Sequence, residues 1–129
     1  MAGMLPPPRS DLPTVRLRQV VEYIEAHLDQ DLGLAELAKV AEYSLSHFKP
    51  MFRNAVGMPA HQFVIERRVQ RARINLLEGK KSISEVAVET GFADPSHMSR
   101  CMRRILGVSP SQIGDESRKF RNSLPIAAS

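Results

Sequence analysis

The 129-residue chain contains no tryptophan and a single cysteine, and aromatic residues make up only 5% of it. With Cys101 alone, an intramolecular disulfide framework is excluded, and such cysteine usage suits a reducing cytoplasm. No apolar run approaches the ~20 residues that a membrane-spanning helix needs, and the N-terminus lacks the apolar segment of a signal peptide. We therefore expect a cytoplasmic protein without membrane contact, whose core is mainly aliphatic.

The sequence also lacks the residue combinations on which most enzymes depend. No nucleophile, base and orienting group stand in a recognisable arrangement, and no glycine-rich segment has the spacing of a phosphate loop. His47 and His97 each lie three residues after an expected helix cap, but no cysteine or carboxylate cluster accompanies them as metal ligands. We therefore predict no enzymatic activity, no cofactor and no metal, and we assign both histidines to backbone capping or phosphate contact.

Positive charge is concentrated in two parts of the chain, although the net charge is only +4. Residues 11–44 carry 3 basic and 7 acidic side chains, whereas residues 45–78 carry 6 and 2. Residues 79–94 have a net charge of −1, and residues 95–121 have a net charge of +4. Because clustered lysine and arginine attract a polyanion, this distribution favours nucleic acid as a partner.

One pattern of residues occurs twice, about fifty positions apart. The offset between the copies is 49 up to Tyr43 and Phe92, and 50 from Ser44 and Asp94 onward, so the second copy has one extra turn residue. The matching positions are Leu37, Ala38, Ala41, Tyr43, Ser44, Ser46, His47, Phe48, Phe52, Arg53 and Gly57 in the first copy, and Val86, Ala87, Thr90, Phe92, Asp94, Ser96, His97, Met98, Met102, Arg103 and Gly107 in the second.

This pattern is typical of a helix-turn-helix, in which small residues let two helices cross closely and a short turn sets a steep angle between them. The bulky residues of the second helix recur at i, i+4 and are expected to face the core. Short hydroxyl groups near the helix start and cations further along then face outward, which suits contact with phosphates and base edges. The outward residues are Ser46, Lys49 and Arg53 in the first copy, and Ser96, Ser99, Arg100, Arg103 and Arg104 in the second.

Apolar periodicity predicts an all-α fold of seven helices without strands. The first helix starts at Thr14, and its apolar positions extend to Leu28; the second follows Gly33. The third, fourth, sixth and seventh helices are expected at residues 45–56, from 59 or 60 to 78, 95–106, and from 110 to about 117.

Capping residues support these boundaries. Ser44 and Asp94 are expected to cap the third and sixth helices, and Ser82 with Glu85 has the spacing of a capping box before the fifth. Glu36, three residues after Gly33, is placed to reach back to the free backbone donors of the second helix.

The expected organisation is a flexible N-terminal arm (1–13), a first helix-turn-helix subdomain (14–58), a linker helix (59–79), a second subdomain (80–117) and a C-terminal tail (118–129). About 20 residues of helix span roughly 30 Å, close to the ~34 Å repeat of B-DNA. We therefore expect two recognition helices to reach successive major grooves.

Over residues 17–113 the chain resembles the DNA-binding domain of the AraC/XylS transcription regulators. Residues 83–110 follow that family's signature nearly position by position, and residues 72–77 also match. The resemblance implies a bacterial regulator that binds asymmetric promoter DNA. It assigns base reading to Ser46, Lys49 and Pro50 in the first unit, and to Pro95, Ser96, Ser99 and Arg100, with His97 beside them, in the second. Phosphate contacts are expected from His47, Arg53, Arg103 and Arg104.

The chain departs from the family pattern in two places. Pro50 replaces a polar or basic residue and cannot donate to the Ser46 carbonyl, so we expect a kink in the first recognition helix. Ile113 and Gly114 replace an aromatic-arginine pair, so we expect the last helix to dock more loosely.

One alternative is a helical protein-interaction module without DNA binding, because the acidic first helix could meet a partner. If the chain is an activator, RNA polymerase is a further expected partner. We expect a monomer associated with the nucleoid. It acts either alone or as the DNA-binding part of a longer regulator, and both possibilities stay open.

Overall fold

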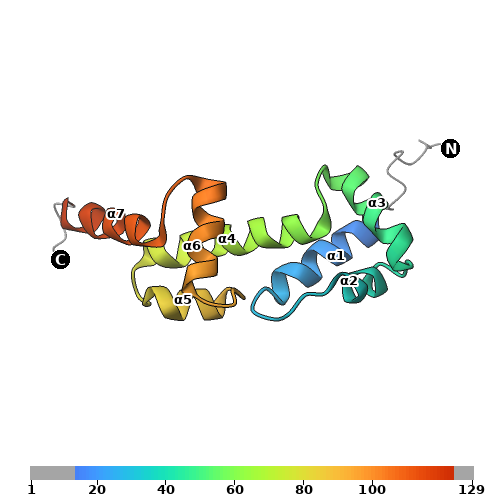
Figure 1. The fold of residues 1–129 in the computed structure, drawn as a ribbon, viewed down its shortest axis with the longest axis horizontal. Coiled ribbons are helices and arrows are strands. Elements are labelled where there is room, and N and C mark those ends of the chain that lie inside the picture. The colour runs from blue at the N-terminus through green and yellow to red at the C-terminus, as the bar shows by residue number, and fades with distance from the viewer. Residues whose placement is uncertain (1–13, 124–129) are drawn as a thin grey trace. The chain divides into compact units, whose positions relative to one another are not determined.

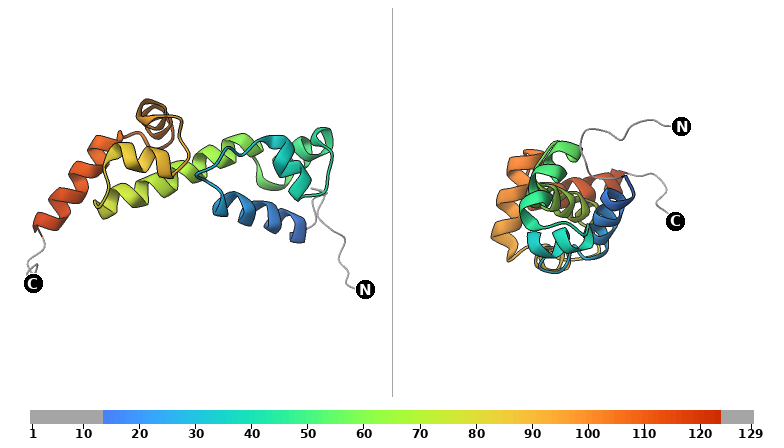
Figure 2. Two further views of the ribbon diagram at one scale, coloured as in Figure 1. Left: turned by 90° about the horizontal axis from the view of Figure 1, so that it is seen from below. Right: turned by 90° about the vertical axis from the view of Figure 1, so that its right-hand side faces the viewer.

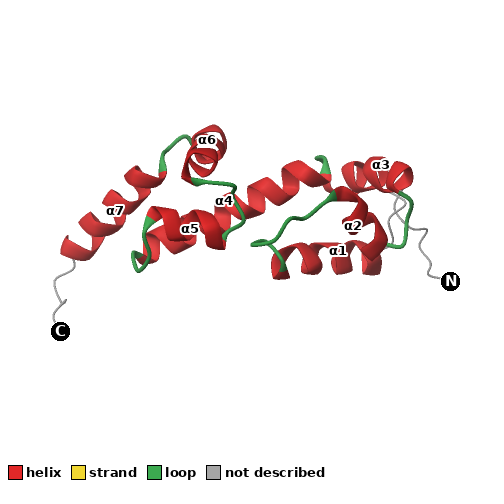
Figure 3. Cartoon of the chain, turned by 60° about the horizontal axis from the view of Figure 1, so that its bottom comes forward, coloured by secondary structure: helices red, strands yellow, loops and turns green. Residues whose placement is uncertain are grey.

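The computed structural model describes residues 14–123, in which helices are joined by loops and no strand occurs (Figures 1 and 3). The helices are α1 (Thr14–Ala26), α2 (Leu34–Val40), α3 (Leu45–Val56), α4 (Ala60–Glu78), α5 (Ile83–Glu89), α6 (Pro95–Leu106) and α7 (Pro110–Ser123). The predicted all-α class with seven helices is confirmed for these residues. The N-terminal arm predicted for residues 1–13 lies outside the described residues.

The chain divides into two compact units, and the division falls inside α4, between Val64 and Ile65. Ala60 and Val64 belong to the core of the first unit, whereas Val69 and Leu76 belong to the core of the second. The predicted linker helix is therefore an integral part of both cores. Figure 2 gives two further views of the helices within each unit.

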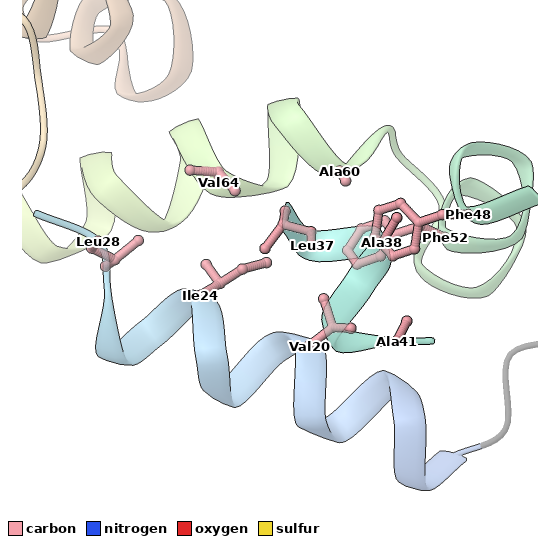
Figure 4. Packing of buried hydrophobic residues seen from close by; sticks show 10 residues of the cluster. All are labelled: Val20, Ile24, Leu28, Leu37, Ala38, Ala41, Phe48, Phe52, Ala60 and Val64. Carbon is pink, nitrogen blue, oxygen red and sulfur yellow. The ribbon is translucent and has the colours of Figure 1, made fainter. Parts of the chain in front are cut away.

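The first core combines aliphatic side chains of α1, α2 and α4 with two phenylalanine rings of α3. Figure 4 shows Ile24 of α1 and Leu37 of α2 pointing toward each other in this interior. The rings of Phe48 and Phe52 are fully buried, with 5.6 Å between their centroids. The prediction that these i, i+4 positions of α3 face inward is confirmed.

The second core repeats this arrangement with more flexible side chains. Met98 and Met102 of α6 are fully buried at the positions that phenylalanine occupies in the first unit. Cys101 is a free thiol and is buried beside them. Cys101 is therefore a packing residue of the second core.

The last helix corrects the predicted start of the tail. α7 extends to Ser123, whereas we expected it to end at about Ser117 with a tail from residue 118. The prediction stopped where the apolar pattern stops. Between Gly114 and Pro125, however, no glycine or proline interrupts the chain, so nothing in the backbone chemistry ends the helix at Ser117.

α7 is anchored to its unit by packing and by hydrogen bonds. Ile113 fills a core position with only 6% of its surface exposed, and the buried Ser117 hydroxyl donates to the Leu77 carbonyl at 2.6 Å. Ser109 and Gln112 form a capping box at the start of the helix, with bonds of 3.2 and 2.7 Å. This box was not predicted, although it has the required spacing.

Two glutamates were expected to cap the start of a helix, and one of them does. Ser82 and Glu85 form the expected capping box before α5, with hydrogen bonds of 3.1 and 2.8 Å. The Glu36 carboxylate does not serve as the cap of α2; it accepts a hydrogen bond from the Tyr23 hydroxyl of α1. This hydrogen bond, with desolvation adding to it, raises the pKa of Tyr23. Glu36 therefore ties α2 to α1.

Both helix-turn-helix corners reverse the chain in the same way. After α2, the Tyr43 amide donates to the Ala38 carbonyl at 2.9 Å, and after α5, the Phe92 amide donates to the Ala87 carbonyl at 2.9 Å. A helix that ends with such a bond needs a residue in the left-handed backbone conformation, and that residue comes just before the aromatic one. In the second corner that residue is glycine, whereas in the first it is Glu42, with φ of 62°.

Replacing Glu42 with glycine is therefore expected to stabilise the protein by about 0.5–1 kcal/mol, because glycine adopts this conformation without steric strain. Losing the ion pair between Glu42 and Arg16 reduces this gain in stability only slightly, since the Glu42 side chain is 73% exposed. Urea unfolding measures the change. The reverse exchange, Gly91→Glu, is the matched control and should destabilise by about 1–2 kcal/mol. A Glu42→Gly protein no more stable than the parent would contradict this account.

Candidate nucleic-acid interface

Each unit presents the second helix of its helix-turn-helix, α3 or α6, with one face buried and the other exposed. All but two of the contact residues predicted from the sequence are exposed; Ser99 and His97 are half-buried. The exposed ones are Ser46, His47, Lys49, Pro50 and Arg53 on α3, and Pro95, Ser96, Arg100, Arg103 and Arg104 on α6.

The two exposed faces begin at equivalent caps. The Ser44 hydroxyl accepts a hydrogen bond from the His47 amide at 3.3 Å, and the Asp94 carboxylate accepts one from the His97 amide at 2.8 Å. Each helix is twelve residues long and ends at a glycine with positive φ. Both predicted caps are confirmed, and the recognition helices therefore have the same length and register.

No acidic residue occurs within α3 or α6. α3 carries Lys49 and Arg53, and α6 carries Arg100, Arg103 and Arg104. Cations in the last helical turn are also favoured by the partial negative charge of the helix C-terminus. Each face thus combines short hydroxyl groups at its start with cations along its length, an arrangement suited to an anionic polymer.

The main difference between the two faces lies at Pro50 and Arg100, which occupy the same position in the repeat. α3 passes through Pro50 as one helix, although proline has no N–H to donate to the Ser46 carbonyl. The kink expected there stays a prediction. Pro50 offers no donor to a base, whereas Arg100 has five N–H groups, so the second face has more capacity for hydrogen bonds.

His97 differs from the other predicted contact residues. Its ring packs edge-on against Phe92, with 5.4 Å between ring centroids. Its Nδ1 atom is buried and has no hydrogen-bond partner among the described residues. His47, at the equivalent position of α3, is exposed. This geometry favours a role for His97 in positioning the start of α6 against the corner over a role in reading bases.

Beside α3 the structure contains a hollow of about 400 Å³ that the sequence did not predict. Its lining comes from α2, α3 and the start of α4 and consists of Leu34, Lys49, Pro50, Arg53, Pro59, Ala60 and His61. His61 was missed because a lone histidine at the start of a helix carries no distinctive pattern. Only the packing of three helices brings it next to the basic residues of α3.

Two further features, a metal-binding cluster and a membrane-spanning helix, are absent from residues 14–123. No group of three or more histidine, cysteine, aspartate or glutamate side chains is placed to hold a metal ion there. Within the same range, no helix has the length and apolar character needed to cross a membrane.

A family model described as a helix-turn-helix domain matches residues 37–115. The crystal structure of a probable AraC family transcriptional regulator from Rhodopseudomonas palustris is 25% identical, with a TM-score of 0.72, and the match covers 81% of this chain and 98% of that one. The DNA-binding domain of AdpA, solved in complex with a target DNA, is 31% identical, with a TM-score of 0.78, and the match covers 84% and 98% of the two chains. The chain belongs to the AraC family. This family consists of transcription regulators and is non-enzymatic.

Two curated relatives are longer than this chain. A probable transcriptional regulator, LumQ of Photobacterium leiognathi, is 36% identical over 99 residues, which are 75% of this chain but 40% of LumQ. A regulator of the helix-turn-helix type from Staphylococcus aureus is 29% identical over 97 residues, which are 13% of its length. The AraC-type domain of this chain therefore accounts for less than half of either relative.

Proposed function

We propose that this AraC-family chain regulates transcription by inserting α3 and α6 into successive major grooves of promoter DNA. The observation that carries the proposal is the pair of acid-free, cation-bearing helix faces in equivalent registers. The similarity to the AdpA domain, which was solved with a target DNA, supports the same conclusion. Two such faces provide two contacts with one polyanion.

The proposed spacing rests on the expectation from the sequence that about 20 residues of helix, roughly 30 Å long, match the ~34 Å between major grooves on one side of B-DNA. Sequence choice is assigned to the residues near the start of each recognition helix, and binding strength to the cations of the last turn. Because Pro50 offers no donor, the second unit is assigned the larger share of sequence choice.

The wider setting of the proposal follows from the sequence. We propose that the chain binds as a monomer in the cytoplasm, on the nucleoid, and that RNA polymerase is a second partner if the regulator activates transcription. An interaction module without DNA binding, the alternative considered above, would show no salt-dependent shift of promoter DNA in a gel.

Footprinting on a selected binding site tests the proposal. The expected protection covers about two turns of DNA on one face, with two separated groups of major-groove contacts. Removing the cations of α3 (Lys49→Ala with Arg53→Ala) should weaken one group first, and removing those of α6 should weaken the other. Protection confined to one turn would contradict the proposal.

Arg103 and Arg104 are expected to contact phosphates, since they lie more than two turns beyond the start of α6. Replacing either with alanine should weaken all DNA sequences similarly and lower the slope of log affinity against log salt by about 0.9. Fluorescence anisotropy at several salt concentrations measures the slope. A change in preferred sequence with an unaltered slope would reverse the assignment.

Arg100 is expected to read a base, by a bidentate pair to guanine O6 and N7 worth ~1–3 kcal/mol of discrimination. Arg100→Ala should relax the preference at one base position in one half-site while leaving non-specific binding nearly intact. Selection of binding sites from a random pool, with the parent and Arg103→Ala proteins in parallel, measures this. An unchanged consensus would mean that Arg100 contacts only the backbone.

A further inference from the structure

The hollow beside α3 has an apolar floor and a basic rim. Leu34 and Pro59 are half-buried and Ala60 is 4% exposed, so the floor presents carbon atoms. Lys49 and Arg53 of α3 and His61 of α4 are exposed around it. The lining contains no carboxylate. A ligand that suits this site has a negative charge attached to an apolar body.

The three basic side chains are not neutralised within the described part of the chain. Other basic residues are held in ion pairs, such as Arg16 with Glu42 and Arg118 with Asp115. Lys49, Arg53 and His61 form no ion pair or side-chain hydrogen bond with any described residue. No described residue therefore has to release these donors when an anion binds.

The hydrogen-bonding chemistry of the rim selects among the parts of a nucleic acid. Lysine and arginine are donors without acceptor capacity, and the histidine ring adds at least one N–H. A guanine edge also presents two acceptors, but it is neutral, whereas the oxygens of a phosphodiester accept hydrogen bonds and carry the negative charge that Lys49 and Arg53 attract. The deoxyribose attached to that phosphate supplies the apolar surface that the floor requires.

We propose that this hollow seats one backbone phosphodiester of DNA and its deoxyribose, with His61, Lys49 and Arg53 as donors. The inference rests on the proposed function and adds His61 to the DNA-binding residues. It also moves Lys49 from base reading to backbone contact. The first unit, which lacks a donor at Pro50, gains one at His61, whose counterpart in the second repeat is Ser111.

The test compares DNA duplexes in which one phosphate at a time is replaced by a neutral methylphosphonate. For the parent protein, one backbone position near the α3 half-site should lose affinity by about 3- to 10-fold on neutralisation. His61→Ser introduces the residue of the second repeat and should lose a similar factor on unmodified DNA, for all sequences alike. For the His61→Ser protein, replacing the phosphate at that same position with a methylphosphonate should cause almost no further loss of affinity.

Matched controls separate this role from a structural one. Ser111→Ala, the equivalent site in the second repeat, should respond to that methylphosphonate like the parent protein. His61→Gln keeps an N–H donor and should retain most of the affinity, and since His61 is exposed, all variants should keep the parent unfolding midpoint. Inorganic phosphate should displace DNA no better than chloride at equal ionic strength.

Several results would overturn the inference while leaving the proposed function intact. These are parent-like binding by His61→Ser on unmodified DNA, a changed base preference in that variant, or equal sensitivity of parent and variant at every methylphosphonate position. Specific displacement by inorganic phosphate would assign the hollow to a free phosphate compound instead. If the parent protein showed no salt-dependent DNA binding, the proposed function itself would fail.

Discussion

The corner between the two helices of each helix-turn-helix is the constraint on which the rest of the structure depends. A backbone amide just after the corner bonds to a carbonyl five residues earlier, at Ala38 or Ala87, and this bond ends the first helix and redirects the chain. The aromatic residue that donates the bond also packs at the corner. The direction of α3 and α6, and therefore the face that each presents, follows from these few atoms.

The two units form this corner with different residues. The second unit uses glycine at the left-handed position and aspartate as the cap of α6, and both residues suit their positions well. The first unit uses Glu42 and a longer bond to Ser44, and it carries a proline inside α3. Among the described residues, the non-glycine residue with positive φ, Glu42, thus lies in the unit whose recognition helix has fewer donors to offer a base.

Most of the fold was predictable because its signals are local. Caps such as Ser82 and Asp94, glycine stops and the i, i+4 apolar pattern act within one or two turns, and each was read correctly from the sequence. The cap predicted at Glu36 was wrong because a distant part of the chain decides its partner: the Glu36 carboxylate accepts a hydrogen bond from Tyr23 of another helix. The hollow that contains His61 exists only once three helices are packed, so no spacing in the sequence could reveal it.

The sharing of α4 by both cores has a consequence for how the protein unfolds. Within a helix each amide bonds four residues back, so hydrogen bonds of α4 cross the division between Val64 and Ile65. Loss of either core would fray the helix that the other core uses as one of its walls. The two units are therefore expected to unfold cooperatively, and a destabilising change in one lowers the population of intact binding surface in both.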